Sequence, residues 1–232
     1  MNLYLIPTVL APDTQNQVLP TQIFDTVKNL DAYFVEELRT ARRFIGSLKT
    51  GKVIDDIEFQ LLDKKTPELV VESRLKRWLA DGKDVGVMSE AGCPAVADPG
   101  ALAVKIAHKL GIVVLPLVGP SSILLALMGS GFSGQSFAFN GYLPIDRADR
   151  IKALSKLARA AGEGQTQIFM ETPFRNNQVL QDILANLNGE LKLCIAVDIT
   201  DKMQSINTLT INQWKKITLD LHKRPVMFLL GQ

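Results

Sequence analysis

The sequence of 232 residues contains only two histidines and two cysteines. His108 is predicted on the polar side of a helix, and His222 near a helix end, where a cation is favoured. Cys93 and Cys194 lie far apart and form neither a metal-ligand spacing nor a disulfide framework. These absences argue against a Ser–His–Asp or Cys–His catalytic site and predict that the protein holds no metal.

Long apolar runs are also missing. The longest candidate, residues 112–132, is interrupted by Pro116, Gly119 and Pro120, and no stretch reaches the roughly 18 apolar residues of a membrane span. The N-terminal region lacks the basic segment of a signal peptide, so we expect a cytoplasmic protein without membrane contact. A net charge of +2 argues against a chain coated with nucleic acid, but is compatible with a local basic patch.

Strand and helix patterns alternate in the first half of the sequence. Nearly continuous apolar strands, typical of a parallel sheet covered on both faces, are predicted at residues 3–7, 32–37, 84–89 and 112–117. Helices are predicted at residues 21–30, 67–83 and 100–111. The expected buried helix positions are Ile23, Phe24, Val27, Leu30, Val71, Leu75, Trp78 and Leu79.

The second half predicts another α/β domain with longer and more amphipathic strands. The strands are expected at residues 136–144, 166–172, 191–200 and 224–232, and the helices at 121–132, 146–164, 173–189 and 210–222. We therefore predict two α/β domains, residues 1–117 and 118–232. No long linker separates them, so we expect a tight junction with a cleft between the domains.

Two loops follow predicted strands and precede predicted helices. Residues 89–100, "SEAGCPAVADPG", contain Gly92, which allows close backbone approach, and Asp98, which could cap the next helix. Residues 118–126 repeat this arrangement, with Ser121 or Ser122 beginning the helix. In open α/β sheets, ligands bind beyond the carboxyl ends of the strands. A stiff turn with a helix cap, or a simple serine cap, explains the same residues.

Two further segments combine acids with arginines. Residues 34–45, "FVEELRTARRFI", place Glu36 and Glu37 before a helix that contains Arg39, Arg42 and Arg43. Residues 169–175, "FMETPFR", place Glu171 and Arg175 four positions apart. Each segment could form surface or local ion pairs, or it could face a phosphate-bearing substrate.

Taken in series, these segments, together with "FNGYLP" at residues 139–144, resemble the tetrapyrrole-methylase superfamily of S-adenosylmethionine-dependent methyltransferases (class III). Within it they are most similar to the branch that methylates a cytidine ribose in small-subunit ribosomal RNA. The similarity in order and spacing extends over nearly the whole chain. It implies a homodimer of two-domain subunits with S-adenosylmethionine in the cleft between the domains, and ribosomal RNA or the small ribosomal subunit as partner.

Carried over by position, the resemblance also implies site residues. The cofactor would contact Gly92, Cys93, Pro94, Val96, Ser121, Ser122, Ile123, Met170 and Val226. Glu37, Asp98 and Glu171 would be the candidate bases that assist a ribose hydroxyl. Arg39, Arg42, Arg43 and Arg175 would hold RNA phosphates. The helix predicted at residues 146–164 adds further possible phosphate ligands, for which a solvated helix surface is the alternative: Arg147, Arg150, Lys152, Lys156 and Arg159.

The sequence departs from the pattern of this branch mainly on the substrate side. Leu38 and Cys93 each stand where threonine is usual, Phe174 stands where histidine is usual, and the loop after the first strand lacks the usual glycines. We therefore expect that the chain still binds the cofactor of this branch, but that its substrate differs. Methylation of a tetrapyrrole or another small molecule, or cofactor binding without catalysis, are the alternatives.

Overall fold

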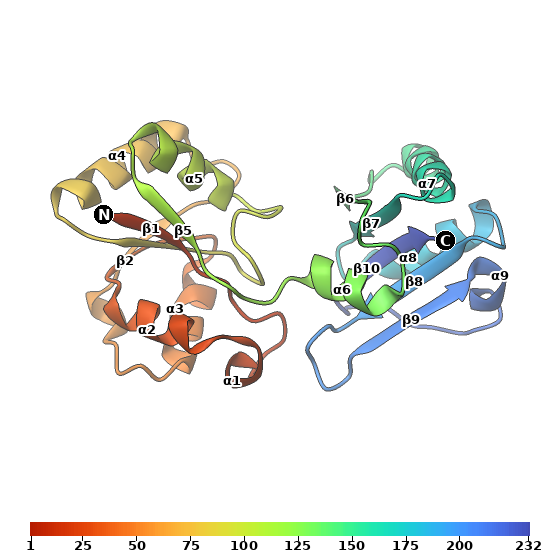
Figure 1. The fold of residues 1–232 in the computed structure, drawn as a ribbon, viewed down its shortest axis with the longest axis horizontal. Helices are drawn as coiled ribbons and strands as arrows, with labels where there is room; N and C mark the ends of the chain where they lie inside the picture. Colours follow the sequence, from red (N-terminus) through yellow and green to blue (C-terminus); the bar gives the residue numbers. More distant parts are fainter. The chain divides into compact units, whose positions relative to one another are not determined.

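Two sheets, one in each half of the chain, organise the structure (Figure 1). The computed structural model describes residues 1–232, which divide into two compact units, Met1–Ser121 and Ser122–Gln232. The sequence placed this boundary slightly earlier, after Leu117. The α/β class predicted for both halves is confirmed.

The N-terminal unit is built on a five-stranded sheet in the order β3-β2-β4-β1-β5, with every neighbouring pair parallel. Its strands are β1 (Asn2–Leu5), β2 (Ala32–Val35), β3 (Glu58–Leu61), β4 (Val85–Met88) and β5 (Val113–Pro116). All residues of β2 and β4 are buried. Three of the four predicted apolar runs thus form the inner strands β1, β2 and β4 of a parallel sheet, and the fourth forms the edge strand β5.

Helices cover both faces of this sheet (Figure 1). They are α1 (Gln15–Val18), α2 (Thr21–Asn29), α3 (Leu38–Ser47), the 3-10 helix η1 (Ile54–Asp56), α4 (Glu68–Ala80) and α5 (Gly100–Lys109). Trp78 of α4 and Ile106 of α5 belong to the core on one face, and Ile23 of α2 and Phe44 of α3 to the core on the other.

Most of the predicted buried positions are confirmed, with two exceptions. Leu79 is 41% exposed, and Phe24 is only partly buried. Leu79 follows the fully buried Trp78, and successive helical residues point about 100° apart, so Leu79 turns toward solvent.

The C-terminal unit contains a mixed five-stranded sheet in the order β6-β7-β10-β8-β9. Its strands are β6 (Phe137–Tyr142), β7 (Thr166–Met170), β8 (Lys192–Val197), β9 (Ser205–Thr210) and β10 (Val226–Gly231). Only the β6–β7 pair is parallel. Its helices are α6 (Ser122–Ser130), α7 (Arg147–Gly162), α8 (Asn176–Asn186) and α9 (Ile211–Trp214).

Several predictions for this unit are wrong in part. The helix expected at residues 210–222 is confined to α9, and β9 precedes it where no strand was predicted. The strands are longer than those of the first unit, as predicted, but all six residues of β10 are buried, so this strand is not amphipathic. Its Phe228 stacks on Phe169 of β7, with ring centroids 5.6 Å apart, at the centre of the unit's core.

No helix of the structure is both long enough and apolar enough to cross a membrane.

Candidate functional site

The loop between β4 and α5 has a strained backbone held by one carboxylate. Gly92, Ala95 and Ala97 have positive φ angles of 75°, 66° and 62°. Oδ1 of Asp98 accepts hydrogen bonds from the amide of Ala95 at 2.8 Å and from that of Gly100, the first residue of α5, at 2.6 Å. Left-handed φ angles are costly for alanine, and such strain concentrates at functional sites.

This loop contacts the segments that follow β1 and β5. The amide of Thr8 donates to the carbonyl oxygen of Gly92 at 2.9 Å. Sγ of Cys93 lies 3.4 Å from the carbonyl oxygen of Pro120. A Cβ atom on Gly119 would collide with the ring of Pro7, so only glycine fits there. Since β1 lies between β4 and β5 in the sheet, three neighbouring strands contribute loops to one cradle at their carboxyl ends.

The predicted residues of this loop differ in accessibility. Gly92 and Pro94 are buried, Cys93 is half-buried, and Val96 is 49% exposed. Of the predicted contacts, Val96 therefore offers the most open surface to a ligand. Ser121 precedes α6, and Ser122 is its first residue, as expected; both are half-buried, as is Ile123.

Carboxylates gather at the same edge of the N-terminal sheet. Burial, with the nearby charges of Glu90 and Asp98, raises the pKa of Glu36, which follows β2. Burial also raises the pKa of Asp98, although its two backbone hydrogen bonds act to lower it. Oδ2 of Asp98 is buried and has no hydrogen-bond partner within the protein. An acceptor without a donor is costly in the free protein and suits a ligand that brings a donor.

Glu37 has a different position from its neighbour. It is the N-cap of α3, and its carboxylate accepts hydrogen bonds from the amides of Arg39 at 2.9 Å and Thr40 at 2.6 Å. These bonds lower the pKa of Glu37. The structure gives Glu37 a capping role, and its catalytic role stays a prediction. Glu36, which sequence reasoning did not select, is the acid that faces Glu90 and Asp98.

The arginines of α3 lie on its exposed side. Arg39 and Arg43 are exposed, and Arg42 forms an ion pair with Asp55. A surface ion pair contributes little to stability, so Arg42 is available to an anionic ligand.

In the C-terminal unit, Glu171 follows β7 and is buried. Its Oε1 accepts hydrogen bonds from the amide of Thr172 at 2.6 Å and from Nε and Nη2 of Arg175 at 3.1 and 2.5 Å. Its Oε2 is buried without a partner. Glu171 and Arg175 thus form an ion pair with each other, which is the alternative that the sequence left open for these residues.

Met170 and Val226, the predicted cofactor contacts of this unit, differ in exposure. Met170 is partly exposed at the end of β7. Val226 is 5% exposed and packs in the unit's core. Its side chain therefore offers little surface to adenine.

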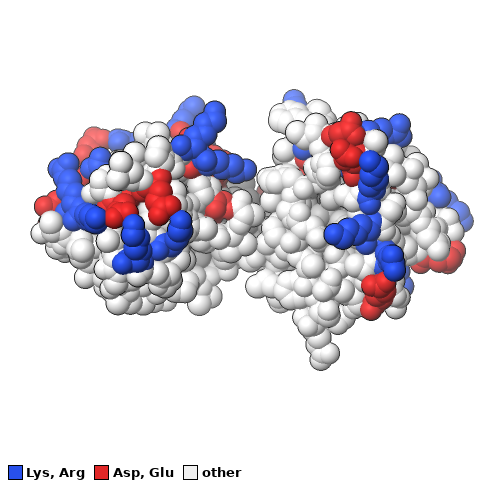
Figure 2. Space-filling model, turned by 90° about the horizontal axis from the view of Figure 1, so that it is seen from above, with Lys and Arg blue, Asp and Glu red and all other residues white.

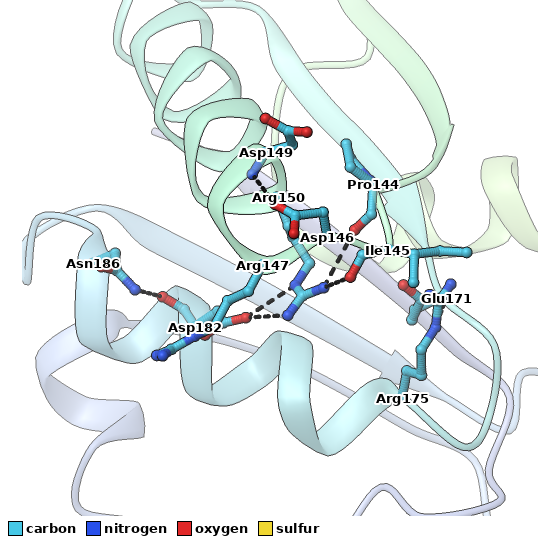
Figure 3. A network of polar contacts seen from close by, with 10 residues as sticks. All are labelled: Pro144, Ile145, Asp146, Arg147, Asp149, Arg150, Glu171, Arg175, Asp182 and Asn186. Carbon is cyan, nitrogen blue, oxygen red and sulfur yellow. Dashed lines mark hydrogen bonds and ion pairs between the residues drawn. The ribbon is translucent and has the colours of Figure 1, made fainter.

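A buried arginine holds the segment after β6 (Figure 3). Arg150 of α7 is 1% exposed and binds Oδ2 of Asp182 through Nε and Nη2 at 2.9 and 2.7 Å. Its Nη1 donates to the carbonyl oxygens of Pro144 and Ile145 at 3.2 and 2.8 Å. The sequence grouped Arg150 with possible phosphate ligands on α7, and this is wrong, because the buried guanidinium makes four hydrogen bonds inside the unit.

The exposed charges on the face drawn in Figure 2 are of both signs, and blue and red atoms alternate over both units. Several charged residues of the helices form ion pairs, such as Lys105–Glu68, Lys109–Glu72 and Arg159–Glu163. A solvated helix surface, the alternative weighed for α7, explains this pattern better than a phosphate-binding patch.

Comparisons with known proteins place these observations in context. No family model matches the chain. The ribosomal RNA small subunit methyltransferase I of Neisseria meningitidis serogroup A is 31% identical over 214 residues, covering 91% of this chain and 68% of the relative. The enzymes of the same name from Vibrio cholerae and Bacillus subtilis are each 29% identical, covering 90% and 91% of this chain and 68% of each relative.

Solved structures show the same fold. The methyltransferase CobJ matches with a TM-score of 0.66 and 14% identity, over 100% of this chain and 94% of that one. Uroporphyrin-III-C-methyltransferase from Thermus thermophilus matches with a TM-score of 0.59 and 15% identity, over 99% of this chain and 94% of that one.

Proposed function

The chain belongs to the ribosomal RNA small subunit methyltransferase I family, and from this we propose that it is an S-adenosylmethionine-dependent methyltransferase that acts on a ribose 2'-hydroxyl of small-subunit ribosomal RNA. The observation that carries the proposal is the cradle formed by the loops after β1, β4 and β5, in a chain with these relatives. The likeness to tetrapyrrole methylases concerns the fold alone, so a tetrapyrrole substrate is the weaker candidate.

The residues of the cradle fit the cofactor. Ala95 and Ala97 are at least partly exposed, and their small side chains leave the backbone of the loop accessible to a ligand. Oδ2 of Asp98 is an acceptor that lacks a protein donor. We propose that Gly92, Cys93, Pro94 and Val96, with Ser121, Ser122 and Ile123, hold S-adenosylmethionine, which supplies an electrophilic methyl group when bound.

A ribose hydroxyl is a weak nucleophile, so a carboxylate that accepts its proton would assist the reaction. Among the acids of the N-terminal unit, Glu36 suits this role best. Its raised pKa makes its carboxylate a stronger base than an ordinary one, whereas the carboxylate of Glu37 is engaged by two amides. We assign Asp98 to the loop and the cofactor, and Glu171 to the orientation of Arg175.

The remaining assignments complete the proposal. Arg39, Arg42, Arg43 and Arg175 would contact RNA phosphates, which position a nucleic acid without reading its sequence. Homodimer formation and a cytoplasmic location are predictions of the resemblance and of the sequence. Light scattering coupled to size-exclusion chromatography tests the dimer.

The test is methyl transfer from radiolabelled S-adenosylmethionine to three acceptors: small ribosomal subunits, their extracted RNA, and uroporphyrinogen III. Label recovered in RNA as a 2'-O-methyl nucleoside supports the proposal. Label in the tetrapyrrole would replace it with the small-molecule alternative. Cofactor binding by calorimetry without transfer to any acceptor would identify a binding protein that has lost catalysis.

A further inference from the structure

We propose that Phe174 and His222 form a stacking platform for an unpaired base of the RNA substrate. This inference rests on the proposed function, since it names the part of the RNA that the C-terminal unit contacts. Phe174 lies two residues before the start of α8, and His222 lies in the turn before β10.

Phe174 presents an aromatic ring to solvent. The residue is 69% exposed, and its ring meets that of His222 edge to face, with centroids 6.0 Å apart and an interplanar angle of 71°. In such a pair His222 can cover at most one face of the Phe174 ring, so at least one face is free of this partner. A single exposed apolar residue needs no explanation. The argument therefore depends on how this pair is supported.

The two segments that carry the rings are bound together by four hydrogen bonds. The side chain of Asn177 donates to Oδ1 of Asp220 at 2.7 Å and accepts from the amide of Leu221 at 2.8 Å. The side chain of Asn176 donates to the carbonyl oxygen of Arg224 at 2.7 Å. The amide of Lys223 donates to the carbonyl oxygen of Pro173 at 3.0 Å. These bonds hold the two segments that carry the rings together before any ligand binds, which reduces the entropy lost on binding.

The groups next to the rings favour a nucleotide over an apolar protein side chain. Phe174 is followed by Arg175, and His222 by the exposed Lys223. Oδ1 of Asp220, the acid in the turn, accepts hydrogen bonds from the side chain of Asn177 and from the amide of His222 at 3.0 Å. An aromatic face flanked by cations matches a flat base attached to a phosphate, and stacking of this kind accepts any base.

The platform is tested by RNA binding, not by catalysis. The probe is a fluorescein-labelled single-stranded RNA of roughly ten nucleotides, a length within the usual range of single-strand sites. Binding is measured by anisotropy for the full chain and for Phe174→Ala, Phe174→Trp and His222→Ala. Met203→Ala is the matched control, because Met203 is 71% exposed on the same unit and lies outside the platform.

We expect Phe174→Ala to raise the Kd for single-stranded RNA by about five-fold or more, which corresponds to the lower limit for loss of one stacked base. Phe174→Trp should retain the affinity, and Met203→Ala should not change it. The same probe with abasic sites should bind the wild type more weakly and should respond little to Phe174→Ala. Circular dichroism should show unchanged unfolding for Phe174→Ala, because the ring is mostly in solvent.

Two results would overturn the proposal. One is a Phe174→Ala variant with the affinity of the Met203→Ala control, and the other is an equal loss of affinity for the normal and abasic probes. Failure of the proposed function gives a different outcome. If the wild type transfers no methyl group but its RNA affinity depends on Phe174, the proposed function fails and the platform stands. If Phe174→Ala still methylates RNA and binds it as tightly as the wild type, the platform fails and the proposed function stands.

Discussion

Glu36 and Glu37 are neighbours in the chain, but their carboxylates lie in different environments. Glu37 caps α3, and Glu36 faces the charges of Glu90 and Asp98. If Glu36 accepts the proton, Glu36→Gln should lower kcat by about 100-fold or more, the lower range for general-base catalysis, with little change in KM. Glu37→Gln, the matched control, should retain most of kcat. Equal losses in both variants would remove Glu36 from this role.

The raised pKa of Glu36 also predicts how stability depends on pH. The folded chain holds this proton more tightly than the unfolded chain does, so ionisation of Glu36 destabilises the fold as pH rises above its ordinary pKa of 4.5. Glu36→Gln removes that charge. The variant should therefore have a larger free energy of unfolding than the wild type near pH 7, and the difference should shrink toward about pH 4. Urea unfolding at both values checks this, and a gain that does not change with pH would contradict it.

The sequence could identify the acidic pair but not the acid that faces the site. That choice depends on the residue at which α3 begins, and helix ends are uncertain by one or two residues even in structures. Leu38 begins the helix, so the side chain of Glu37 turns back to the first amides. The partner of Glu36 in this environment, Glu90, is distant in the chain, and no local pattern connects them.

At the level of single elements, α7 and α8 are joined by a buried ion pair, Arg150–Asp182, that the sequence did not predict. Arg150→Ala would leave the carboxylate of Asp182 buried and short of its main partner, which typically costs about 3–5 kcal/mol. Arg147 binds the other oxygen of Asp182, but its side chain is 68% exposed. Arg147→Ala should therefore cost less than about 1 kcal/mol.

Fluorescence of Trp214, which is buried in the same unit, reports this unfolding in urea. Both variants remove one guanidinium from the carboxylate of Asp182. A difference between their losses of stability therefore comes from the burial of Arg150, not from the loss of a charge. Similar losses of stability in the two variants would show that the position of Arg150 inside the unit does not matter.

All inner strands and the edge strands β5 and β6 were predicted, whereas two other edge strands were missed. β3 and β9 each lie at the edge of a sheet, and neither was predicted. Their sequences, "EFQL" and "SINTLT", carry polar residues because one side of an edge strand meets solvent. Inner strands such as β4 and β10 are buried throughout and give the continuous apolar runs that sequence patterns detect.

At the scale of the whole molecule, a ligand that binds only the folded chain must stabilise it. S-adenosylhomocysteine, the product form of the proposed cofactor, at about 100 times its Kd should add roughly 2.7 kcal/mol. Differential scanning calorimetry should show this as a higher melting temperature. Val96→Arg is the discriminating variant, because Val96 is 49% exposed and its replacement should block the cradle without disturbing the core. Pro94 is buried, so an arginine there would also disturb packing.

Comparison of the two proteins by calorimetry distinguishes binding of the ligand in the cradle from a general effect of the solute on stability. Stabilisation of the wild type that is absent in Val96→Arg places the ligand in the loop after β4. Equal stabilisation of both proteins, or no stabilisation of either, would contradict the assignment of Val96.

The difference in burial between the two cysteines makes Cys93 a natural site for labelling with a thiol reagent. Cys194 is fully buried in β8, whereas Cys93 is half-buried in the proposed cofactor loop. A thiol reagent should therefore modify the folded protein at one position and the unfolded protein at two. Burial raises the pKa of the Cys93 thiol, so the reaction should be slow at neutral pH and faster in alkaline buffer. The rate of this single modification then measures how much of the loop is occupied, with no engineered residue.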